Sequence, residues 1–266
     1  MLIKTLVLRA LQQHRKGIIG WTLGIVGLVC IQLGVYPTIR SSATDWSSLV
    51  DQFPESFKKA LRMMDYASER GYLTTELLSF TLPFIVISLG TAWGSRLVTE
   101  EEDLGSADIV LSLPMSRTRY TAARFLAAFL VMIFSITCFF LAVIIGTRML
   151  HLSIPISQYL SASVSLFSIG FFMMTIAAAI GALTGKRTVA LGISMSVAIT
   201  LFVLYSLAPL VKAIDKTTRF NPMQWTIGSQ PLLHGTSAGY TTCIVLTCIP
   251  FIAATFYLFS RRDVVN

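Results

Sequence analysis

The residues with the clearest chemical potential lie in one short charged segment, residues 100–117, of a chain that is otherwise poor in charge. The segment opens with four consecutive acids and ends next to two arginines, Arg117 and Arg119. A largely apolar run at residues 109–113 lies between the two charged groups. This mixture favours a short helix that is presented to a groove on a soluble protein partner. The alternative is that the acids only end one membrane helix and the arginines only anchor the next.

Composition places the chain among membrane proteins. Of its 266 residues, 54% are hydrophobic and only 13% are charged, and the mean hydropathy is +0.71. Such a chain mostly faces lipid. No stretch is long enough and polar enough to form a separate soluble domain, so residues 1–266 are interpreted as a single transmembrane domain.

Six long apolar runs predict six membrane-spanning helices, because a span needs about 20 mainly apolar residues. Helices are favoured over a barrel, since the runs are continuous and do not alternate with a period of two. The expected fold is an all-α polytopic membrane protein. The predicted spans are residues 17–36, 76–98, 122–147, 157–183, 188–211 and 239–259.

Basic residues in the short loops predict the orientation. With the N-terminus inside, both termini are cytoplasmic and twelve Lys and Arg residues face the cytoplasm, against four in the two shorter outer loops. The net charge of +8 therefore reports topology, and no nucleic-acid partner is expected. Residues 1–16 carry apolar side chains at helical spacing between basic ones, which favours an N-terminal helix in the cytoplasmic interface over a simple extension of the first span.

Several kinds of site are not expected. The interiors of the predicted spans hold essentially no ionisable residue, which argues against a proton relay or an ion-coupled carrier. His14, His151 and His234 lie in separate predicted loops and form no metal site. The four cysteines lie within predicted spans and are expected to pack as apolar residues.

Residues 181–188 look like a nucleotide-binding P-loop but depart from its pattern. That motif needs four residues between its glycines and a hydroxyl residue directly after the lysine. Here only three residues separate Gly181 from Gly185, and Arg187 follows Lys186. The stretch is therefore interpreted as a tight basic turn, and neither ATP binding nor enzyme activity is expected of this chain.

The order of residues in the charged segment resembles the loop between the second and third spans of type-two ABC export permeases. The pattern there is an acidic pair, a glycine, an acidic or polar residue, a small aliphatic run, then a proline, a small residue and an arginine. The matching residues are Glu101, Glu102, Gly105, Asp108, Leu111, Pro114, Ser116 and Arg117. Residues 71–73 and 260–263 extend the resemblance toward both ends, while Thr99 and Arg124 differ from the residues common at those positions.

The resemblance implies that the segment holds a cytoplasmic coupling helix, which docks on a separate ATP-binding subunit. ATP and Mg²⁺ would be bound by that partner, and this chain would need no cofactor of its own. A second permease subunit, identical or different, would complete the exporter. The residues expected to couple to the ATPase are Glu100, Glu101, Glu102, Asp103, Gly105, Asp108, Pro114, Arg117 and Arg119.

Spans rich in Phe, Met, Leu and small residues indicate a hydrophobic or amphipathic cargo such as an antibiotic, a peptide or a lipid. The same residues would also pack any helical bundle. A prokaryotic plasma membrane is the expected location. The alternative function is a membrane scaffold or sensor that recruits a soluble partner without transporting anything.

Overall fold

The computed structural model of the chain describes residues 2–41, 52–54, 58, 68–105 and 116–262. Every regular element in this part is a helix, and none is a strand. Six of its helices are long and apolar enough to cross a membrane. The prediction of an all-α polytopic membrane protein is therefore confirmed.

The six spans differ in detail from the predicted bounds. They are α2 (Arg15–Ser41), the compound span Glu69–Asp103, α8 (Arg117–Met149), α9 (Ile156–Thr184), α10 (Arg187–Leu207) and α14 (Ala238–Arg261). Five of them extend past both predicted ends, in several cases through charged residues such as Arg15, Asp103 and Arg117. The exception is α10, which ends before residue 211 because Pro209 cannot continue a helix.

Shorter helices precede and connect the spans. They are α1 (Leu2–Gln13), α11 (Lys212–Thr218), α12 (Pro222–Thr226), the 3-10 turn η2 (Ile227–Ser229) and α13 (Pro231–His234). The N-terminal helix α1 buries Val7 and Ala10 against Ala123 and Ala127 of α8. Its position in the membrane interface stays a prediction. The coupling helix is expected within residues 100–117, and residues 106–115 of that segment lie outside the described residues.

The second span is interrupted near its outer end. It consists of α5 (Glu69–Leu73), a π-helical turn η1 (Thr74–Leu78) and α6 (Thr81–Asp103). Glu76 lies in the π turn, where its Oε2 accepts a hydrogen bond of 3.3 Å from Gln32 Nε2. The expectation of essentially uncharged span interiors is wrong at this position, because the span begins at Glu69 and not at residue 76.

Helix α9 forms the centre of the bundle. In α9, 72% of the most apolar stretch is buried, against 22% in α10 and in α14. Its closest neighbour is α6, and small residues bring the two backbones together: a Cβ atom on Gly90 or Gly94 would collide with the backbone carbonyl of Gly170 or Met174. Such close approach is the usual way to pack helices in lipid, where burial between helices gains little from the hydrophobic effect.

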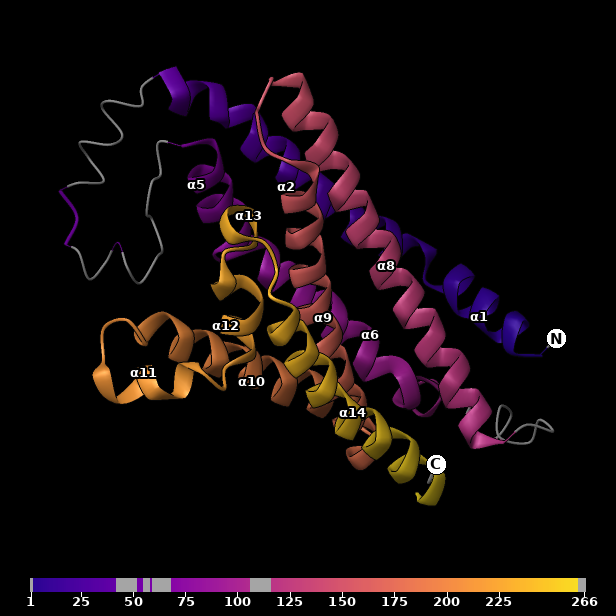
Figure 1. The fold of residues 1–266 in the computed structure, drawn as a ribbon. Helices are drawn as coiled ribbons and strands as arrows, with labels where there is room; N and C mark the ends of the chain where they lie inside the picture. Colours follow the sequence, from indigo (N-terminus) through magenta and orange to yellow (C-terminus); the bar gives the residue numbers. More distant parts are fainter. Residues whose placement is uncertain (1, 42–51, 55–57, 59–67, 106–115, 263–266) are drawn as a thin grey trace.

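Several helix ends and both termini lie at one end of the bundle, the lower right in Figure 1. The start of α1, the ends of α6 and α14 and the start of α8 lie there. The opposite end carries α5 and the short helices α11, α12 and α13. We call the former the termini end; it holds the acidic end of α6 and the start of α8.

We expect Gly90→Ala to destabilise the protein by about 1–3 kcal/mol, because a methyl group would push against a backbone carbonyl that cannot move aside. The thermal unfolding midpoint of the purified protein in detergent measures the effect. Gly24→Ala in α2 is the matched control, since a Cβ there meets nothing within 4 Å. Equal midpoints for the two variants would contradict the close α6–α9 packing.

Candidate functional site

The last turn of α6 carries Glu100 to Asp103 to the termini end of the bundle. The helix stops there because Gly105 adopts φ +65°, and the amides of Leu104 and Gly105 bond back to the carbonyls of Glu100 and Glu102. Acids are unfavourable at this end of a helix, since the dipole presents partial negative charge there. These carboxylates therefore need donors or cations from other elements.

Glu100 is the most buried of the four acids, with 8% of the residue exposed. Its Oε2 forms an ion pair with Nη2 of Arg124 in α8, which is equally buried. Its Oε1 lies 2.6 Å from Nε2 of His14, at the junction of α1 and α2. The cavity left in this cluster measures only about 10 Å³, too small for a ligand. Glu100 therefore joins three parts of the chain: α6, α8 and the junction of α1 and α2.

His14 is neutral in this cluster. Burial, followed by the positive charges of Arg96, Arg124 and Arg187, lowers the pKa of His14 from 6.5 to about 4. Because Arg96 Nη1 can only donate, the Nδ1 atom that lies 3.4 Å from it accepts, and the proton of the neutral imidazole is then on Nε2, the atom that faces Glu100. The edge-to-face packing of the imidazole and Trp93, with ring centroids 5.4 Å apart, fixes the ring.

Glu101 has a different partner, the hydroxyl of Tyr120 in α8, which donates to Glu101 Oε1 at 3.4 Å. Tyr120 is buried and stacks on Phe259 of α14 at a centroid distance of 6.2 Å. The guanidinium of Arg124 lies 5.9 Å from the centre of the Tyr120 ring. Glu101 is thus linked through one phenol to both α8 and α14.

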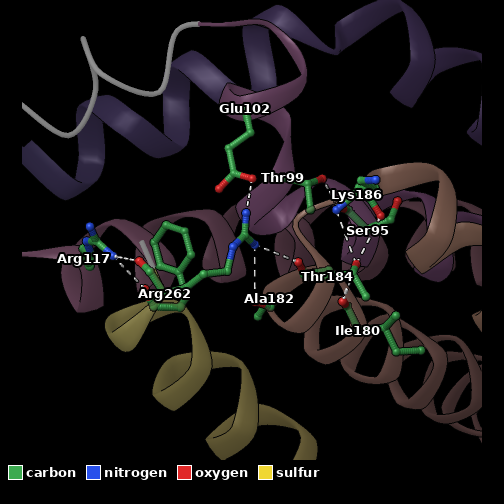
Figure 2. A network of polar contacts seen from close by, with 11 residues as sticks. Ser95, Thr99, Glu102, Arg117, Ile180, Ala182, Thr184, Lys186 and Arg262 are labelled. Atoms are coloured by element: carbon green, nitrogen blue, oxygen red, sulfur yellow. Dashed lines mark hydrogen bonds and ion pairs between the residues drawn. The ribbon is translucent and has the colours of Figure 1, made fainter. Parts of the chain in front are cut away.

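Glu102 pairs with Arg262, the first residue after α14 (Figure 2). Arg262 Nη1 also donates to the carbonyls of Gly181 and Ala182 in α9, both at 3.3 Å. Arg117 donates from its Nη1 to the carbonyl of Phe259, at 3.3 Å, and to that of Arg262. One set of side chains therefore holds the ends of α6, α8, α9 and α14 together.

The residues predicted for coupling divide into three groups. Glu100, Glu101, Glu102 and Arg117 take part in internal contacts. Asp103, Gly105 and Arg119 are exposed beside them. Asp108 and Pro114 lie outside the described residues.

Sequence reasoning missed the partners of the acids. From sequence, His14 is expected in a loop, and Arg96, Arg124 and Arg262 belong to the twelve basic residues that indicate orientation. Only Arg262 carried a further signal, because it belongs to the basic pair that follows the last span. Among the described residues no group of three or more His, Cys, Asp or Glu side chains could hold a metal ion.

We expect the free energy of unfolding to fall as the pH drops from about 6.5 to about 4, because the unfolded chain protonates His14 before the folded protein does. The loss from this group reaches at most about 3 kcal/mol and levels off below pH 4. His14→Gln should flatten the dependence in thermal unfolding between pH 7.5 and 4. His234→Gln, at an exposed position, is the control and should leave the slope unchanged. An unaltered slope in His14→Gln would contradict the assignment of a neutral imidazole.

Comparison with known proteins assigns the family. No curated protein matches the sequence. The sequence profile of the ABC-2 family transporter proteins matches residues 11–264, nearly the whole chain. This range contains all six spans, the acidic turn of α6 and Arg262. The chain therefore belongs to the ABC-2 family of transporter proteins.

Proposed function

We propose that this transmembrane subunit of an ABC transporter is the permease of an ATP-driven exporter, and that a separate ATP-binding subunit docks on the segment between α6 and α8. ATP and Mg²⁺ would be held by that partner. The multi-pass chain would sit in a prokaryotic plasma membrane with the termini end toward the cytoplasm. The basic residues at this end support that orientation.

The main observation behind the proposal is that residues next to one another at the end of α6 have different environments: some are paired inside the bundle and others are exposed. Glu100, Glu101 and Glu102 are each tied to a different partner inside the bundle. The next two residues, Asp103 and Leu104, are exposed, and Leu104 has 61% of its surface accessible. A protein that pushes on this exposed tip would move an element connected to α8, α9 and α14.

The packing of the bundle supports a mechanism in which two parts move relative to each other. Since α6 and α9 approach at backbone distance, they would shift as one body. The spans α10 and α14 are buried over only 22% of their most apolar stretch, which leaves surface for a second permease subunit and for a path between the subunits. ATP binding would then bias the equilibrium between two arrangements of these parts.

Two grooves support an apolar or amphipathic cargo such as an antibiotic, a peptide or a lipid. One groove of about 220 Å³ lies between α8 and α9, with Phe140 and Phe167 in its wall and Ser163 among its few polar groups. The other is a shallow, open depression along the exposed face of α10 from Val189 to Leu201. Apolar linings with few hydroxyl groups suit ligands of this class.

Charge reversal at the exposed tip tests the docking site. We expect Asp103→Lys and Arg119→Glu each to weaken binding of the cognate ATP-binding subunit by about fivefold, corresponding to about 1 kcal/mol for a charge at the rim of an interface. Both side chains are exposed, so the thermal unfolding midpoint should not change. Titration of the purified permease in detergent with the ATP-binding subunit measures the affinity.

Lys216→Glu provides the matched control, because Lys216 is exposed in α11 at the opposite end of the bundle. It should leave the affinity unchanged. An equal loss in the control would contradict docking at the α6–α8 segment. Capture of a soluble partner without ATPase activity would favour the scaffold or sensor alternative.

A further inference from the structure

We propose that Arg262 is a positioning residue that makes the end of α6 move together with the ends of α9 and α14. The inference rests on the proposed function, because it concerns how motion at the docking segment reaches the spans. The segment joins α6 directly to α8, whereas α9 and α14 lie far from it in sequence. Movement must therefore reach these two helices through non-covalent contacts: the close α6–α9 packing carries it between the bodies of those helices, and Arg262 joins the end of α6 to the ends of α9 and α14.

The guanidinium of Arg262 has the geometry of such a link (Figure 2). Its Nη2 pairs with Oε2 of Glu102, while its Nη1 bonds to two carbonyls in the last turns of α9. The side chains of Arg262 and Glu102 are only 21% and 12% exposed, so water screens the pair weakly. A planar fork can satisfy a carboxylate and two carbonyls at once, which an ammonium group cannot do in the same plane.

The end of α9 is shaped to receive this cation. Carbonyls at a helix C-terminus lack some of their partners and carry partial negative charge, so a guanidinium is favourable there. The helix ends at Gly185, which adopts φ +69°. A Cβ atom at this position would collide with the guanidinium of Arg262. Gly185 thus ends α9 and also leaves the space that Arg262 occupies.

A second contact holds Arg262 from the other side. Arg117, in the first turn of α8, donates to the carbonyls of Phe259 and Arg262. Contact with Arg117 of α8 therefore fixes the backbone of Arg262, while the side chain of Arg262 bridges α6 and α9. The neighbouring Arg261 is different: it is exposed, and its guanidinium lies 4.7 Å from the ring centre of Tyr257 within α14.

The test measures whether two helix ends stay together. Spin labels replace Leu104 after α6 and Leu183 in the last turn of α9, both exposed. Double electron–electron resonance then gives the distribution of distances between the two labels. It is measured on the purified chain, and on its complex with the ATP-binding subunit with and without ATP. We expect one narrow population in every state of the otherwise unchanged protein.

The distance distribution between the labels should broaden toward longer distances in three variants: Arg262→Gln, Glu102→Gln and Gly185→Ala. The broadening should be strongest in the ATP-bound complex. Arg262→Lys should retain the narrow population in part, and Arg261→Gln should match the unchanged protein. Arg262→Gln and Gly185→Ala change no residue of the exposed tip, so in the doubly labelled protein these two variants should bind the ATP-binding subunit as tightly as the labelled protein without them. Distributions in Arg262→Gln and Gly185→Ala that equal those of the unchanged protein would overturn the inference, as would a broad distribution before any substitution.

Failure of the proposed function would be seen separately. If no ATP-binding subunit binds the unchanged protein, the docking proposal is wrong, and the comparison on the chain alone decides whether Arg262 joins the two helix ends. If the subunit binds and Arg262→Gln leaves the distances unchanged with ATP, docking stands and the role of Arg262 is wrong.

Discussion

The arrangement of the termini end depends on one electrostatic constraint, the presence of four carboxylates in the last turn of a helix. The dipole of α6 disfavours negative charge there, and burial of Glu100 adds a desolvation cost. Both terms are offset by donors and cations that come from α8, from the junction of α1 and α2, and from the residue after α14. The acids therefore determine which helix ends lie next to one another. Since removal of one partner would leave a buried charge unpaired, the cluster also resists local separation of these ends.

The rest of the bundle is organised around the contrast between close and loose packing. Lipid gives little hydrophobic drive for helices to associate, so contact depends on small residues that let backbones approach. Gly90 and Gly94 do this between α6 and α9. In the outer spans α10 and α14 only 22% of the most apolar stretch is buried, and the hydroxyl residues Ser196 and Thr200 of α10 are exposed. A stiff centre beside two loosely held spans is a structure in which force at one end can change the arrangement of the others.

Much of this fold could be predicted from hydropathy alone, because each span is recognisable from its own residues. The partners of the acids could not be predicted, since Glu102 and Arg262 are 160 residues apart and meet only when α6, α9 and α14 have packed. Arg124 shows the same limit: a basic residue near a span end reports orientation in sequence, whereas its ion pair with Glu100 depends on the relative position of two helices. From sequence, Glu76 is expected at the start of a span because the residues before it, from Glu69 to Thr75, are too polar to predict one, although the helical chain begins at Glu69. The positive φ of Gly185 agrees with the predicted turn, but the space that it leaves for Arg262 is a tertiary feature.

The central proposal is that the ATP-binding subunit drives the permease by contact with the exposed tip of α6. The most direct measurement is photo-crosslinking from position 104, with the exposed Leu104 replaced by benzoylphenylalanine in cells that also produce the cognate ATP-binding subunit. The account predicts a crosslinked product that contains both proteins and changes in yield when ATP hydrolysis in the partner is blocked. The same photoreactive residue at position 216, in α11 at the other end of the bundle, should give no such product. Absence of the product from position 104, or equal yields from the two positions, would contradict the account.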